Sequence, residues 1–94
     1  MTEKVALVTG ASRGIGQAIA IAIGKMGYQI VGTATTEAGA EAITAHFQQS
    51  GISGVGMMMN VSNTESVDAT LKAITEQFGA PAVLVNNAGI MHVT

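Results

Sequence analysis

The sequence contains no cysteine, few charged residues and no cluster of basic ones. Because cysteine is absent from all 94 residues, disulfide bonds, thiolate metal sites and cysteine nucleophiles are excluded. Four Lys and Arg against six Asp and Glu give a formal charge of −2. Without a basic cluster to neutralise a phosphate backbone, we expect no nucleic-acid partner. Hydrophobic residues make up 48% of the chain, which excludes disorder by composition.

Long apolar runs are also absent. Glycine and polar residues interrupt every run before it reaches the roughly 18 residues that a membrane span needs. The first four residues, MTEK, lack the basic and then apolar pattern of a secretion signal. We therefore expect a cytoplasmic protein with no membrane partner. A chain of this size buries roughly 60–68% of the surface that its unfolded form exposes, which is enough for one core.

Apolar segments and turn residues alternate along the chain. Short apolar runs predict four strands, over residues 5–8, 30–33, 55–61 and 83–85. Apolar residues at helical spacing predict three helices between them, which end at Gly27, Gly51 and Gly79. The first helix has its predicted apolar stripe on Ile15, Ala18, Ile19, Ala22, Ile23 and Met26.

Polar residues mark where the second and third helices begin. Thr36 is the expected N-cap of the second helix, and Ser62 with Glu65 matches a capping box for the third. The methionines over residues 57–59 are expected to fill the core.

This alternation predicts an α/β fold with a parallel sheet, right-handed crossovers and helices on its faces. It matches the first half of a doubly wound Rossmann-type fold, a three-layer α/β/α arrangement with strand order 3-2-1-4. In the complete fold, later strands extend the sheet beyond strand four. We therefore expect residues 1–94 to be the N-terminal part of a single dinucleotide-binding domain, incomplete without later strands and helices.

Gly10, Gly14 and Gly16 lie between the first strand and the first helix. The N-terminus of a helix offers unpaired N–H groups and a partial positive charge that suit a pyrophosphate, and glycine lets the backbone approach it. The spacing alone is weak, because chance produces it about 0.2 times in a chain of this composition. The position of these glycines within a βαβ unit is what predicts a dinucleotide-binding site. The alternative is a glycine-rich turn that binds no ligand.

The end of the second strand indicates which dinucleotide is bound. NAD-binding proteins usually carry an acidic residue there for the ribose 2′-OH, but residues 32–36 (GTATT) contain none. Arg13, in the glycine loop, could pair with a 2′-phosphate, although the same residue could also be a solvated loop charge. The missing acid and the available arginine together favour NADP(H).

Two motifs together resemble those of the short-chain dehydrogenase/reductase family: TGASRGIG over residues 9–16 and NNAG over residues 86–89. Within that family, residues 31–35 (VGTAT) followed by Glu37 and Gly39 look like the β-ketoacyl-acyl-carrier-protein reductases. That resemblance implies reduction of a carrier-bound 3-oxoacyl chain by NADPH, in bacterial fatty acid synthesis, by a homotetramer. An acetoacetyl-CoA reductase, another NADP-linked short-chain alcohol dehydrogenase, or a non-catalytic nucleotide-binding module remains open.

The same resemblance implies which residues contact the cofactor. The glycine loop would hold the phosphates and Thr35 the 2′-phosphate. Residues 60–61 would flank the adenine, and residues 87–89 would line the cleft near the ribose and nicotinamide. An amide at Asn60, where many relatives have Asp, can still hydrogen-bond an adenine edge. The complete set is Gly10, Ala11, Ser12, Arg13, Gly14, Ile15, Gly16, Thr35, Asn60, Val61, Asn87, Ala88 and Gly89.

No catalytic residue can be named within the chain. The family's chemistry uses a tyrosine acid whose pKa is lowered by a lysine four residues further on. The only tyrosine is Tyr28, and Gly32 stands four residues after it, so we expect Tyr28 to be a packing or surface residue. His46 has no partner at metal-ligand spacing, and we expect no metal site.

Overall fold

Four parallel strands form the sheet of the computed structural model, which describes residues 4–11, 14–60 and 62–85. The strands lie in the order β3-β2-β1-β4 and are β1 (Val5–Val8), β2 (Gln29–Ala34), β3 (Gly54–Met58) and β4 (Pro81–Val85). The helices between them are α1 (Gly14–Gly24), α2 (Glu37–Ser50) and α3 (Thr64–Gln77). This order confirms the predicted first half of a doubly wound α/β fold.

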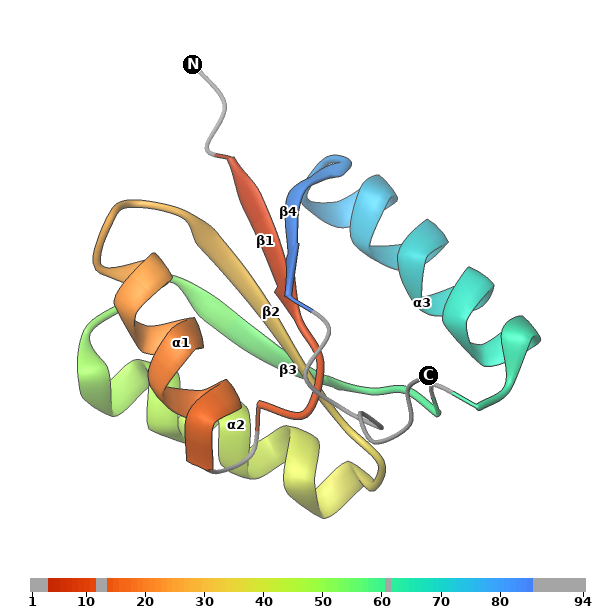
Figure 1. Ribbon diagram of the computed structural model, residues 1–94, viewed down its shortest axis with the longest axis horizontal. Helices are drawn as coiled ribbons and strands as arrows, with labels where there is room; N and C mark the ends of the chain where they lie inside the picture. Colours follow the sequence, from red (N-terminus) through yellow and green to blue (C-terminus); the bar gives the residue numbers. More distant parts are fainter. Residues whose placement is uncertain (1–3, 12–13, 61, 86–94) are drawn as a thin grey trace.

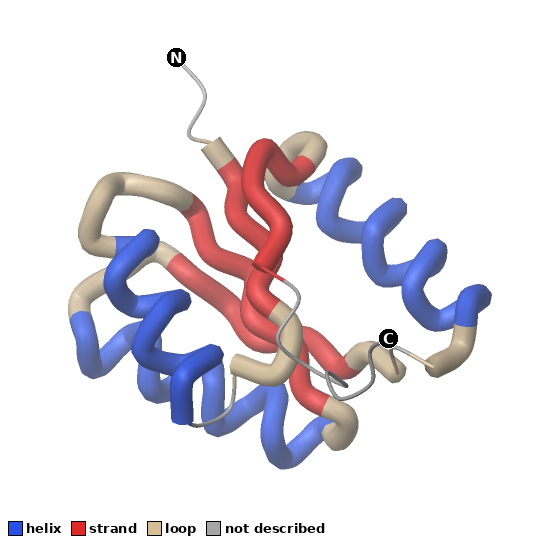
Figure 2. Tube along the Cα trace, viewed as in Figure 1, coloured by secondary structure: helices blue, strands red, loops and turns tan. Residues whose placement is uncertain are grey.

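The helices cover both faces of the sheet. α1 and α2 lie on one face and α3 lies on the other (Figure 1), so the strands form the middle of three layers (Figure 2). Among the described residues, none of the helices combines the length and the hydropathy that a membrane crossing requires.

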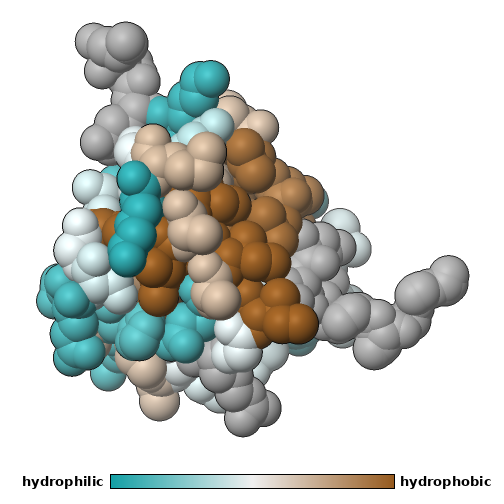
Figure 3. Space-filling model, turned by 60° about the vertical axis from the view of Figure 1, so that its left-hand side comes forward, coloured by the Kyte–Doolittle hydropathy of each residue, from teal (hydrophilic) through white to brown (hydrophobic). Residues whose placement is uncertain are grey.

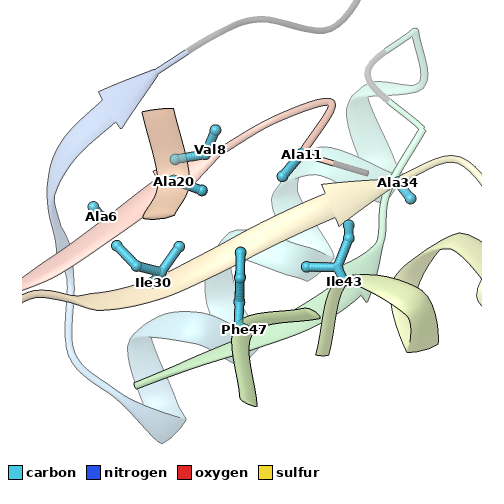
Figure 4. Packing of buried hydrophobic residues seen from close by; sticks show 8 residues of the cluster. All are labelled: Ala6, Val8, Ala11, Ala20, Ile30, Ala34, Ile43 and Phe47. Atoms are coloured by element: carbon cyan, nitrogen blue, oxygen red, sulfur yellow. The ribbon is translucent and has the colours of Figure 1, made fainter. Parts of the chain in front are cut away.

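The sheet has a hydrophobic core on each face, because alternate strand residues point in opposite directions. The core on the α1 and α2 side (Figure 4) contains Ala6, Val8, Ala11, Ala20, Ile30, Ala34, Ile43 and Phe47. The core on the α3 side contains Val5, Leu7, Val31 and Ile74. The apolar run over residues 5–8 is therefore buried on both faces, as its sequence predicts.

Helix α2 approaches the sheet closely because glycines of β2 and β3 face it. A Cβ atom added to Gly32 would lie 3.0 Å from Ile43 Cγ2 and 3.2 Å from Phe47 Cζ, and one added to Gly54 would also meet the Phe47 ring. Phe47 is completely buried. Its ring occupies the space that side chains at these two strand positions would need.

The apolar stripe predicted for the first helix is wrong. The buried residues of α1 are Gly16, Ala20 and Gly24, all of them small. They face inward because the helix packs tightly: a Cβ on Gly24 would lie 2.6 Å from Ile52 Cδ1. Ile21, which the pattern places off the stripe, is half-buried against the first core.

Two of the larger apolar residues of the predicted stripe, Ile15 and Met26, are exposed to solvent, whereas Ile23 packs against the first core. Ile15 and Met26 are each 72% exposed, and Ile19 and Ile23 are half-buried. Figure 3, in which the α1 side of the molecule is turned forward, shows apolar side chains gathered into a broad area. Exposed apolar areas of this kind commonly mark a surface that another element or chain covers.

The predicted ends of the first helix and of the third strand differ most from the structure. α1 ends at Gly24, and residues 25–27 form a turn that finishes at Gly27 with a φ of 100°. β3 ends at Met58 instead of residue 61, although the Met59 N–H still donates to Ala34 O at 2.9 Å. Of the three methionines expected in the core, Met59 is buried but Met58 is 52% exposed.

The predicted caps of α2 are confirmed and that of α3 is wrong. Thr36 Oγ1 accepts the Gly39 N–H at 3.0 Å, and Gly51 ends the helix with a φ of 74°. The N-cap of α3 is Asn63, whose Oδ1 accepts the Ser66 N–H at 3.1 Å. Ser62 cannot be the cap because it belongs to the preceding turn, where its N–H donates to Asn60 Oδ1 at 3.0 Å.

We therefore expect Asn63→Ala to lower the free energy of unfolding by about 1 kcal/mol, since the first turn of α3 loses its side-chain acceptor. The neighbouring substitution Ser62→Ala should have almost no effect. Urea unfolding of the two variants measures the difference. An equal or larger loss of unfolding free energy in Ser62→Ala would show that Ser62, as in the predicted capping box, is the N-cap.

Candidate nucleotide-binding site

The loop that follows β1 is hydrogen-bonded to the ends of both neighbouring strands. The Thr9 N–H donates to Val85 O of β4 at 3.0 Å, and the Thr9 hydroxyl reaches the same oxygen at 3.4 Å. On the other side, the Ala11 N–H donates to Thr33 O of β2 at 3.0 Å. The loop therefore lies at the carboxyl edge of the sheet, where ligands of doubly wound folds bind.

Glycines allow the chain to turn between β1 and α1. Gly10 has a φ of 65° and Gly14 a φ of 67°, a left-handed conformation that residues with a Cβ rarely adopt. A Cβ added to Gly14 would have no heavy atom within 4 Å. Glycine is required there by backbone conformation, and the space beside it is open.

The N-terminus of α1 suits an anion better than those of the other two helices. α2 and α3 each carry a glutamate in the first turn, Glu37 and Glu65, whereas α1 has no acidic residue there. Gly14 and Ile15 are exposed at this end. The partial positive charge and the backbone N–H groups of the first turn are therefore available to a phosphate group.

The end of β2 presents hydroxyl groups and no carboxylate. Thr33 and Ala34 are buried, and Thr35 is exposed at the point where the strand ends. The next residue, Thr36, uses its hydroxyl to cap α2. The first carboxylate, that of Glu37, is exposed in the first turn of α2.

Asn60 follows β3 at the same edge and is held in a hydrogen-bonded turn. Its N–H donates to Ser66 Oγ at 3.1 Å, its side-chain oxygen accepts the Ser62 N–H, and its carbonyl accepts the Asn63 N–H at 3.0 Å. Asn60 is nevertheless exposed. The contribution of Ser66 was not predicted from the sequence, because it depends on contact between the first turn of α3 and the end of β3.

The structure thus brings together the described members of the predicted site: Gly10, Ala11, Gly14, Ile15, Gly16, Thr35 and Asn60. They follow β1, β2 and β3, whose carboxyl ends share one edge of the sheet. The remaining members lie outside the described residues and are Ser12, Arg13, Val61, Asn87, Ala88 and Gly89.

Tyr28 lies at the opposite edge of the sheet. It immediately precedes β2 and is half-buried against the first hydrophobic core. This position agrees with the expected packing role. Within the part of the chain that the structure describes, no three His, Asp or Glu side chains come together in a group that could hold a metal ion.

Comparison with known proteins identifies the family. A family model described as short chain dehydrogenase matches residues 4–94. The chain belongs to the short-chain dehydrogenase family.

Several curated relatives from this family carry the same name, 3-oxoacyl-[acyl-carrier-protein] reductase FabG. The chain is 54% identical over 87 residues to that of Pseudomonas aeruginosa, 58% to that of Vibrio cholerae and 49% to that of Escherichia coli. Each match covers 93% of this chain, but only 35% of the first relative and 34% of the other two. The chain therefore spans about a third of the length of these curated relatives.

The backbone requirement at Gly14 can be tested by comparing two substitutions. We expect Gly14→Ala to lower the free energy of unfolding by about 1–2 kcal/mol, because its φ of 67° is unfavourable for a residue with a Cβ. Gly14→Asn should cost less, because asparagine visits this conformation more readily. Chemical denaturation measures the free energy of unfolding of both variants. Equal losses in the two variants would show that backbone conformation is not the reason for glycine at this position.

Proposed function

We propose that the whole protein to which this chain belongs is an NADPH-dependent reductase of 3-oxoacyl chains bound to acyl carrier protein. The observation that carries this proposal is the loop between β1 and α1, with left-handed glycines and a helix N-terminus free of acidic residues. The names of the similar P. aeruginosa, V. cholerae and E. coli proteins supply the substrate class. A soluble cytoplasmic homotetramer is the form that we propose for it.

The described residues fit a dinucleotide at the carboxyl edge of the sheet. The first turn of α1 would hold the pyrophosphate with backbone N–H groups, and the loop at Gly10 and Ala11, which is bonded to β2 through the Ala11 N–H, would position that turn. In folds of this kind the adenosine ribose lies at the end of β2. The adenine would therefore lie beside the end of β3, near Asn60. The proposed contacts of Asn87, Ala88 and Gly89 with the ribose and nicotinamide follow the family resemblance. When bound, the nicotinamide supplies the hydride that reduces the 3-oxo carbon.

Selection of NADPH over NADH is proposed to depend on Arg13 and Thr35. A carboxylate at the end of β2 would repel a 2′-phosphate, and none stands between Gly32 and Thr36. The exposed Thr35 offers a hydroxyl at this place. The guanidinium of Arg13 would supply the charge for a paired hydrogen bond to the phosphate.

We further propose that this chain is the N-terminal part of one larger nucleotide-binding domain. β4 lies at one end of the sheet, and its Leu84 side chain is 64% exposed. The apolar side of α1 is uncovered as well. Later strands and helices would cover both, and they would also bring the catalytic tyrosine and lysine, since Tyr28 lies away from the site. We expect residues 1–94 alone to have no reductase activity.

Cofactor selection can be measured in a chimera in which residues 1–94 replace the matching segment of the P. aeruginosa reductase. Arg13→Ala should weaken NADPH binding by about tenfold to a hundredfold, because a hydrogen bond to a charged group is lost. NADH binding should change by less than about threefold. Calorimetric titration of both cofactors gives the two dissociation constants.

Lys25→Ala is the matched control for charge, because Lys25 is exposed in the turn after α1, at the far end of that helix. Its affinity for NADPH should equal that of the unsubstituted chimera. Equal losses of NADPH and NADH binding in Arg13→Ala would show that this residue does not read the 2′-phosphate.

A further inference from the structure

Strand β3 lies at the other end of the sheet, opposite β4, and within the described residues one side of it has no neighbouring strand. Ser53 O accepts the Ile30 N–H and the Met59 N–H donates to Ala34 O, so these two residues direct their backbone groups towards β2. Because the direction alternates along a strand, Gly54, Gly56 and Met58 direct their backbone groups outward. An edge of this kind normally invites pairing with a strand from another chain.

A side chain from α2 occupies the middle of this edge. The Gly56 N–H donates to Thr44 Oγ1 at 2.8 Å, and the Thr44 hydroxyl donates to Ala40 O, one helical turn earlier, at 3.2 Å. A threonine hydroxyl has one proton to donate and two lone pairs to accept with, so both bonds form at once. The oxygen of Thr44 thus takes the place of the carbonyl that a further strand would supply.

The helix also packs tightly over the face of β3 at this position. A Cβ added to Gly56 would collide with the backbone carbonyl of Ala40 and lie 2.8 Å from Ile43 Cβ. The groove that remains between α2 and β3 is lined by Glu37 and Glu41 together with Thr44, Met57 and Met58. Its two carboxylates would repel those of a second copy, which is a common means of protecting a sheet edge.

We propose that Thr44 ends the sheet at β3. Its hydroxyl oxygen accepts the Gly56 N–H and thereby prevents a further β-strand, including the β3 of a second copy, from pairing with this edge. Extension of the sheet is thereby confined to β4. The proposal rests on the contacts of α2 with β3 and is independent of the proposed reductase activity.

Hydrogen–deuterium exchange tests the proposal in the folded chimera, with single amides resolved by mass spectrometry. In the unsubstituted protein, the Gly56 amide should exchange at least about tenfold more slowly than the outward-directed Met58 amide. Thr44→Val, which keeps the shape but removes the hydroxyl, should accelerate exchange of the Gly56 amide by about tenfold. Sedimentation velocity should show that this variant associates further as its concentration rises.

Thr75→Val is the matched control, because the Thr75 hydroxyl makes the same bond within α3, to Leu71 O at 2.9 Å. It should leave both the Gly56 exchange and the association state unchanged, and Thr44→Ser should restore them. Unaltered Gly56 exchange in Thr44→Val would overturn the proposal, and so would faster exchange without further association. If Thr44→Val does not fold, the exchange rates of the Gly56 and Met58 amides in the unsubstituted chimera test the proposal alone. Equal rates for the two amides would overturn the proposal.

Discussion

The hydrogen bonds that join the loop after β1 to β4 and to β2 are the interactions on which the candidate site depends. Thr9 bonds to Val85 and Ala11 bonds to Thr33, with Gly10 between them in a left-handed conformation. These contacts fix where the chain leaves the sheet, and therefore where the N-terminus of α1 begins. The first turn of α1, positioned in this way, can present its N–H groups to an anion without reorganisation. The chain belongs to the short-chain dehydrogenase family, and the nicotinamide cofactor that we propose for it would bind at this edge of the sheet.

Close packing of α2 against the sheet positions the rest of the same edge. Gly32 and Gly54 leave room for the Phe47 ring, and the chain passes from the end of β2 through Thr35 and the Thr36 cap directly into α2. The same approach places Thr44 against the edge of β3. The packing of α2 thus contributes both to the candidate nucleotide site and to the proposed end of the sheet at β3.

Signals that act locally could be predicted from the sequence, and those that depend on tertiary packing could not. The buried run of β1, the Thr36 cap and the Gly51 stop follow from residue type and spacing, and all three are confirmed. The apolar stripe of α1 was predicted on the wrong side, because close approach selects Gly16, Ala20 and Gly24 regardless of hydropathy. The cap of α3 moved to Asn63 because Asn60 holds Ser62 in a turn. The glycine loop was found by its motif, but the roles of Ser66 and Thr44 arise from contacts between distant elements.

The location of the nucleotide is the central claim, and hydrogen–deuterium exchange of the chimera with and without NADPH tests it most directly. The account predicts that saturating NADPH slows exchange over residues 9–17, which span the loop and the first turn of α1, and leaves residues 44–50 of α2 unchanged. Absence of protection at residues 9–17 in a folded chimera, or protection confined to other elements, would contradict it.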